Sequence, residues 1–108
     1  MYLVRFADES LNKSLEKLKI KDVTLYNKIL FTISKLEREP FNSIIIKKKQ
    51  IPKIYVRKYG IDNLRMIKVN QDWRLLYTIA SNEIRIMSIV LEWLDHKEYE
   101  NRFNYCIT

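Results

Sequence analysis

The sequence predicts a single α+β domain in which a pair of helices covers one face of a small, mostly antiparallel sheet. Three observations lead to this fold class. Two stretches between residues 11 and 36 carry apolar residues at helical spacing. Three later stretches between residues 64 and 91 are rich in β-branched and aromatic residues and are joined by short polar connections. A chain of 108 residues supports one modest core, so we expect one domain over residues 1–108.

The first part of the chain predicts one strand and two helices. Residues 2–6 alternate in the manner of a half-buried strand. Asp8 or Ser10 can cap a first helix, and a second helix can begin near Thr24. Pro40 prevents the second helix from continuing, because proline lacks the amide that an interior turn requires. The apolar stripes that we expect to cover the sheet are Leu11, Leu15 and Leu18 in the first helix and Tyr26, Ile29, Leu30, Ile33 and Leu36 in the second.

The middle of the chain is less regular. Residues 44–46 are three consecutive isoleucines, which fit a short strand and a hydrophobic plug equally well. Residues 52–59 predict a short surface helix, because Pro52 can occupy its first turn and Gly60 lies just past its end.

The last part of the chain predicts three strands and a final helix. The strands are expected over residues 64–69, 73–80 and 84–91, with connections of hairpin length between them. The helix is expected over residues 95–103. The order is therefore β-α-α-(α)-β-β-β-α, with the helices packed on one face of the sheet and a short C-terminal helix at the end.

The positive charge of the chain is concentrated in one window. Residues 47–74 hold nine basic and two acidic residues, whereas the eleven basic and eleven acidic residues elsewhere cancel. The whole formal charge of +7 therefore lies in about a quarter of the sequence. A solvated basic face is the ordinary explanation for a run of charges, but this concentration favours a polyanionic partner.

Several classes of protein are excluded by what the sequence lacks. No run approaches the roughly 20 apolar residues of a membrane helix, and the amino terminus lacks the pattern of a signal peptide. The single histidine and single cysteine offer no zinc-ligand spacing. We therefore expect a cytoplasmic protein with no membrane contact, no metal site and no cofactor.

Arg74 is the first candidate for chemistry. It lies on the strand face opposite Trp73 and Tyr77, at the end of the basic window. A guanidinium stays charged and can bind two phosphate oxygens at once, which suits a phosphate site. A purely structural arginine on a strand fits this position equally well.

His96 and Tyr99 are the next candidates. Asp95 and Glu98 form a capping-box pattern around His96, so one interpretation is a solvent-facing residue of the first helical turn. A helix amino terminus disfavours a protonated imidazole, and a neutral imidazole suits a general base. Tyr99 follows three residues later on the same side of the helix, where its alternative role is to pack the helix onto the sheet.

These segments, in this order, resemble the RelE/ParE superfamily of toxins from toxin–antitoxin pairs. The residues that carry the resemblance are 73–77 (WRLLY), the apolar strand at 84–91 and the terminal stretch 95–99 (DHKEY). Residues 94–100 together with Phe103 most resemble the RelE-like messenger RNA interferase branch. The resemblance covers most of the chain and implies the same α+β fold.

The resemblance implies a metal-independent endoribonuclease that cuts messenger RNA at the ribosome and is paired with a cognate antitoxin. Arg74 would be held close to the scissile phosphate, Lys68 would neutralise phosphate, and His96 would act as acid or base. Tyr99 would stack on a base or orient the attacking group. The residues expected to hold RNA are Lys47, Lys48, Lys49, Lys53, Arg57, Lys58 and Arg65.

The chain departs from the family pattern at two places, which leaves alternatives open. RelE proteins carry a closely spaced lysine pair on the strand before Arg74, whereas Arg65 and Lys68 fall on opposite faces of an ideal strand. Many relatives carry an arginine where Asp95 stands. The alternatives are a ParE-like protein that inhibits DNA gyrase without catalysis and an inactive toxin-family binding protein. The combination of Arg74 with His96 and Tyr99 favours the ribonuclease.

Overall fold

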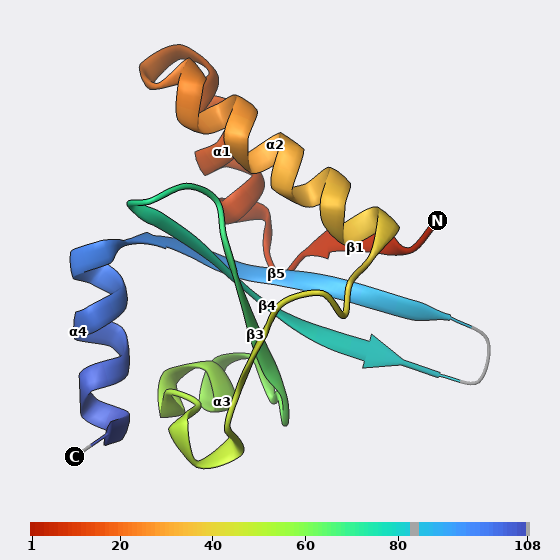
Figure 1. Ribbon diagram of the computed structural model, residues 1–108, viewed down its shortest axis with the longest axis vertical. Coiled ribbons are helices and arrows are strands. Elements are labelled where there is room, and N and C mark those ends of the chain that lie inside the picture. The colour runs from red at the N-terminus through yellow and green to blue at the C-terminus, as the bar shows by residue number, and fades with distance from the viewer. Residues whose placement is uncertain (83–84, 108) are drawn as a thin grey trace.

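The chain folds into a five-stranded sheet with helices on both faces (Figure 1). The computed structural model describes residues 1–82 and 85–107, with side chains as far as Phe103. The elements in chain order are β1 (Leu3–Phe6), α1 (Glu9–Lys21), α2 (Val23–Arg38), β2 (Ile44–Ile46), the 3₁₀ helix η1 (Lys48–Gln50), α3 (Lys53–Tyr59), β3 (Leu64–Lys68), β4 (Trp73–Ser81), β5 (Ile86–Asp95) and α4 (His96–Ile107). The strand order is β1-β5-β4-β3-β2, with β1 parallel to β5 and all other pairs antiparallel. The expected α+β class with a mostly antiparallel sheet is confirmed.

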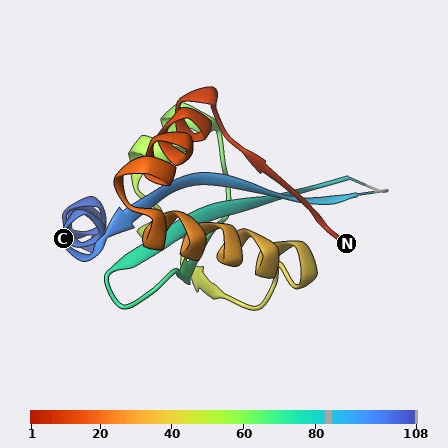
Figure 2. The same cartoon turned by 90° about the horizontal axis from the view of Figure 1, so that it is seen from above.

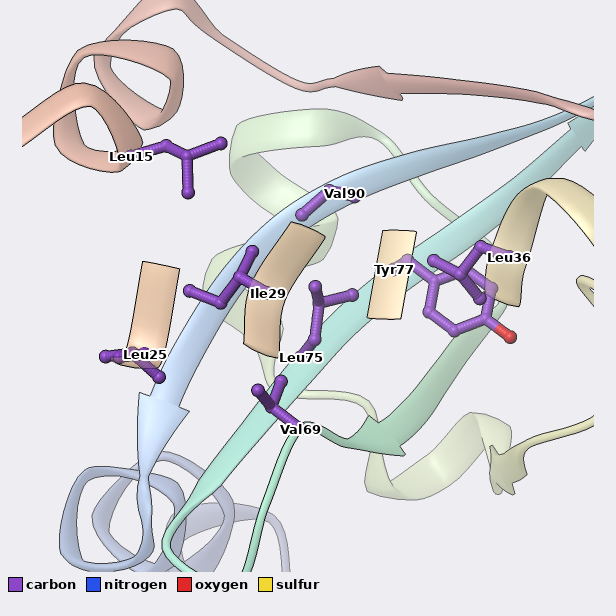
Figure 3. Packing of buried hydrophobic residues seen from close by; sticks show 8 residues of the cluster. All are labelled: Leu15, Leu25, Ile29, Leu36, Val69, Leu75, Tyr77 and Val90. Carbon is purple, nitrogen blue, oxygen red and sulfur yellow. The ribbon is translucent and has the colours of Figure 1, made fainter. Parts of the chain in front are cut away.

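Each face of the sheet carries its own core. On β4, Leu75 and Tyr77 belong to the core under α1 and α2, whereas Leu76 belongs to the core under α3 and α4. Figure 3 shows the first core, in which Leu25 and Ile29 of α2 lie over the sheet. The buried residues of the second core are Ile51, Tyr55, Leu64, Met66, Leu76, Leu91, Leu94 and Phe103.

The expected helical pair on one face is confirmed, but the later helices do not pack on that face. The pair α1 and α2 does cover one face, but α3 and α4 cover part of the other, and α4 lies at the end of the molecule away from the amino terminus (Figure 2). The physical reason is visible on β4 and β5, where Leu76, Leu91 and Leu94 present apolar surface on the second face. Tyr55 of α3 and Phe103 of α4 remove that surface from water.

Two aspartates determine where the first helices begin. The Asp8 carboxylate accepts a hydrogen bond from the Leu11 amide at 3.2 Å, and the Asp22 carboxylate accepts one from the Leu25 amide at 3.1 Å. Asp22 alone separates α1 from α2, so the two helices form a tight pair.

The middle of the chain takes the strand alternative. Residues 44–46 form β2, an edge strand paired with β3, and they do not plug the core. Helix α3 begins after Pro52 and ends at Gly60, which adopts the left-handed conformation with φ of 64°. The short helix η1 has no counterpart in the sequence-based expectation.

The last strand is longer than expected. The predicted strand began at residue 84, which lies outside the described residues, and β5 extends to Asp95 in place of residue 91. Helix α4 therefore begins at His96 directly after the sheet. No helix in the described part of the chain is long and apolar enough to cross a membrane.

Candidate active site

Arg74 and Lys68 are neighbours on the sheet face that α3 and α4 cover. Lys68 of β3 pairs with Arg74 of β4, and Arg74 pairs with Leu94 of β5. Directly opposed residues of antiparallel strands point to the same face, and like charges in that position destabilise the sheet. Within residues 1–82 and 85–107, neither cation forms an ion pair with an acidic side chain. This arrangement opposes folding and favours the binding of an anion.

The guanidinium of Arg74 is packed in place, but one of its nitrogen atoms has no hydrogen-bond acceptor among the described residues. Its Cζ atom lies 5.0 Å from the centroid of the Tyr99 ring, which is a cation–π contact. Its Nη1 atom is buried and has no acceptor among the described residues. A buried donor without an acceptor costs roughly 1–3 kcal/mol. Because Nη1 is shielded from solvent, a phosphate can supply this acceptor only after the groups that cover Nη1 move aside.

The Tyr99 ring packs against the Arg74 guanidinium. The Tyr99 ring also stacks on the Phe103 ring, with centroids 4.4 Å apart and an angle of 26° between the planes. Arg74 and Phe103 both contact the Tyr99 ring, so part of the ring surface is already occupied. Burial raises the pKa of Tyr99, with the Arg74 cation acting in the opposite direction. Its hydroxyl therefore remains a donor at neutral pH.

His96 lies at the start of α4 in the expected capping box. The Glu98 amide donates to the Asp95 carboxylate at 2.8 Å, and the Asp95 amide donates to Glu98 at 3.1 Å. The His96 side chain is 59% exposed, and its Nε2 atom lies 2.7 Å from the Glu100 carboxylate. Since a carboxylate can only accept, His96 contacts Glu100 as a hydrogen-bond donor through Nε2.

A second polar cluster on this face joins three elements. Glu92 of β5 accepts a hydrogen bond of 2.5 Å from the Tyr55 hydroxyl of α3. Both Glu92 oxygens also bind the Arg102 guanidinium of α4, at 3.1 and 3.2 Å. Burial, and then the hydrogen bond to Glu92, raises the pKa of Tyr55. A single carboxylate thus ties α3 and α4 to the sheet.

Sequence reasoning missed Glu92, although a signal was present. Glu92 is an acidic residue inside a mostly apolar strand, and a partly buried carboxylate needs partners. A β-bulge in β5 places the Glu92 side chain on the α3–α4 face. The bulge is visible in the register, in which Leu76 pairs with Glu92 while the next residue, Tyr77, pairs with Val90. Leu91 is the extra residue of the bulge, so the side chains of Leu91 and Glu92 both point to the sheet face that α3 and α4 cover.

The residues expected to hold RNA do not form one surface. Lys49, Lys53 and Arg57 line a groove of about 750 Å³ between the η1–α3 segment and α4. Lys47 and Lys48 line a separate hollow of about 390 Å³ beside β2 and β3. The basic window of the sequence therefore divides into two surfaces in the structure.

Arg65 and Lys58 have other partners. Arg65 lies on the sheet face opposite Arg74, where its guanidinium donates to the Phe41 carbonyl at 3.1 Å and lies 5.4 Å from the Phe41 ring centroid. The Nζ atom of Lys58 lies 3.7 Å from the Asp8 carboxylate. The structure therefore brings Lys68 and Tyr99 to Arg74 but keeps Arg65 away. Strand alternation predicted only that Arg65 and Lys68 lie on opposite faces.

The charge of the site determines what it can hold. Lys68 and Arg74 are cationic and suit a phosphate. Among the described residues, no group of three or more histidine, cysteine, aspartate or glutamate side chains is arranged to hold a metal ion.

The fold is similar to that of a solved protein described as a YoeB/ParE toxin from Agrobacterium tumefaciens. The similarity has a TM-score of 0.60 and covers 87% of this chain and 98% of that chain, at 14% sequence identity. No family model matches the sequence, and no curated protein gives a match. At this sequence identity, the similarity concerns the fold alone.

Proposed function

We propose that this chain is the toxin of a toxin–antitoxin pair, and that it is a metal-independent endoribonuclease acting on messenger RNA at the ribosome in the cytoplasm. The resemblance of its terminal segments to the RelE/ParE superfamily supports the proposal. So does a fold similar to that of a protein described as a YoeB/ParE toxin. The excess charge of the basic window suits a polyanionic substrate.

The observation that carries the proposal is the buried, unpartnered Nη1 atom of Arg74 opposite Lys68. A group that stabilises developing charge works best when it is held in place before the substrate arrives. The stack of Arg74, Tyr99 and Phe103 supplies that support. A phosphorane dianion beside Arg74 would satisfy the guanidinium and relieve its repulsion with Lys68.

The proposed reaction is an internal transfer at phosphorus. The 2′-hydroxyl oxygen of the RNA attacks the adjacent phosphorus, the bond to the 5′ oxygen breaks, and a 2′,3′-cyclic phosphate remains. His96 takes the hydroxyl proton through Nδ1, and the leaving oxygen receives a proton from His96 or water. Arg74 and Lys68 stabilise the charge on the phosphorane oxygens. Tyr99 acts by positioning Arg74.

The proposed partners are messenger RNA on the ribosome and a cognate antitoxin. An active ribonuclease of this kind would harm its own host, so its activity has to be suppressed by binding. Positively charged and apolar surfaces together suit an acidic, amphipathic segment of that antitoxin.

The proposal is tested by incubating the protein with free RNA and with translating ribosomes, both in EDTA, and by sequencing the cut ends. We expect cleavage that leaves cyclic phosphate ends. A DNA gyrase supercoiling assay is performed in parallel. Inhibition of gyrase without cleavage of either RNA substrate would identify a ParE-like inhibitor. Failure in all three assays would identify an inactive binding protein.

A further inference from the structure

Strand β2 leaves one edge of the sheet open. It is the last strand in the order β1-β5-β4-β3-β2, and within the described residues no strand pairs with its outer edge. Its residues are Ile44, Ile45 and Ile46, and the first two of these side chains are 54% and 65% exposed. An edge strand presents backbone amides and carbonyls that can pair with another strand. This edge is therefore apolar and available to an extended segment.

Most of the features that protect an edge strand are missing from β2. Proteins commonly place a lysine, a proline or a bulge within such a strand. In this chain Pro40 lies before β2, the lysines begin only at Lys47, and the register with β3 has no shift. The remaining protection is the length of three residues, which limits any contact to a few hydrogen bonds. We therefore expect a weak association at this edge.

Apolar side chains lie on both faces of β2. Ile45 pairs with Arg65 and shares its face, whereas Ile44 pairs with Met66, which belongs to the core under α3 and α4. Phe41 is 46% exposed, and its ring centroid lies 5.4 Å from the Arg65 guanidinium. A strand that adds to this edge therefore meets apolar surface above and below the sheet.

We propose that β2 pairs in antiparallel fashion with β2 of a second copy of this chain, which joins the two sheets in a dimer. The strand is complementary to itself. A register centred on Ile45 places this residue opposite its counterpart and places Ile44 opposite Ile46 of the second copy. Directly opposed β-branched side chains stabilise a strand pair, and a two-fold dimer uses the same surface on both copies.

The charges beside β2 are compatible with this register. Lys47 lies two residues past Ile45, and it lies in opposite directions in the two copies, so the two lysines are about 13 Å apart along the strands. This distance exceeds the Debye length of about 8 Å at physiological ionic strength. Lys47 of one copy instead lies beside Ser43 of the other, in the neutral stretch 41–43.

The dimer leaves both candidate active sites open on one side of the joined sheet. Strand β2 pairs only with residues 64–66 of β3, so Lys68 lies beyond the pairing. Because directly opposed residues of an antiparallel pair point to the same face, corresponding faces of the two copies stay on the same side. The inference goes beyond the proposed ribonuclease and does not depend on it, since its test measures assembly and not cleavage.

Sedimentation velocity of the full chain, over about 5–300 µM, tests the association. We expect a monomer–dimer equilibrium with a Kd of about 10–100 µM, because the interface is small. Ile45→Lys places like charges directly opposite each other and should raise the Kd by at least about tenfold. Ile20→Lys on α1 is the matched control, since Ile20 is 90% exposed, and should stay within about twofold of the wild type. Thermal unfolding confirms that both variants are folded.

Added salt separates direct pairing from copies joined by a bound polyanion. Each copy carries a formal charge of +7, so screening of their repulsion should strengthen a direct dimer. A dimer held together by bound RNA would instead dissociate as the salt concentration rises, and that result would overturn the proposal.

Disulfide trapping tests the register, in a Cys106→Ser background that removes the native cysteine. In Ile45→Cys the two introduced residues are directly opposite, with Cα atoms about 4.5–5.5 Å apart, so oxidation should link most of the dimer. In Ile44→Cys they are about 8 Å apart, too far for a disulfide, and little linkage is expected. A monomer at every concentration, equal effects of Ile45→Lys and Ile20→Lys, or equal linkage of the two cysteine variants would each overturn the proposal.

Discussion

Replacing Arg74 by methionine should raise stability and lower activity together. Methionine retains packing against Tyr99 but has neither the charge nor the buried donor. Removal of the unpartnered donor recovers about 1–3 kcal/mol, and removal of one of two opposed cations recovers about 0.2–1 kcal/mol. Loss of the cation–π contact costs about 0.5–1 kcal/mol. The free energy of unfolding should therefore increase by about 0.2–3.5 kcal/mol, which raises Tm by about 1–15 °C.

The same substitution should reduce the rate of RNA cleavage by about 10²–10³-fold. Loss of one preorganised group that stabilises transition-state charge typically raises the barrier by about 3–4 kcal/mol. Single-turnover cleavage of a ribosome-bound messenger RNA measures the rate, and thermal unfolding followed by circular dichroism measures Tm. Arg38→Met is the matched control, because Arg38 is exposed in the last turn of α2. It should change the free energy of unfolding by less than about 0.5 kcal/mol and leave cleavage unchanged.

The opposite pattern would refute this reasoning. If the Arg74→Met variant has a lower Tm and cleaves RNA at the wild-type rate, Arg74 is a structural residue whose Nη1 atom finds a hydrogen-bond acceptor in solution. If Tm rises and the rate is unchanged, the site binds no phosphate that matters for the reaction.

Four further predictions concern other ionisable groups. His96→Ala should reduce cleavage by about 100-fold or more with an unchanged Tm, and an unaffected rate would leave His96 as a first-turn residue only. Glu92→Gln should lower the free energy of unfolding by about 1–3 kcal/mol because it weakens a partly buried pair. Because the pKa of Tyr55 is raised in the fold, its ionisation opposes folding, so stability should fall above pH 10 and fall less steeply in Tyr55→Phe. A plot of log K for RNA binding against log salt concentration should have a slope of roughly −3.5 if about five phosphates are neutralised. Joint replacement of Lys47, Lys48 and Lys49 should make this slope less steep. An unchanged slope would mean that these lysines do not contact RNA.

The sequence by itself determined the features that depend on neighbouring residues. The capping box of Asp95 and Glu98 forms as expected, because its two partners are three residues apart. Strand alternation placed Arg65 and Lys68 on opposite faces, because the period of a strand is two. The end of α3 at Gly60 likewise follows from the ability of glycine to adopt a positive φ.

Only the tertiary structure decided which elements cover each face and which charges meet. Periodicity indicates that a face is buried, but it does not indicate which helix buries it, so the position of α3 and α4 was missed. The contact of Glu92 with Tyr55 spans 37 residues and depends on a bulge that the spacing of apolar residues does not reveal. The division of the basic window into two surfaces has the same origin. Lys48 and Lys49 are adjacent in sequence but line different hollows, which the order of charges along the chain does not reveal.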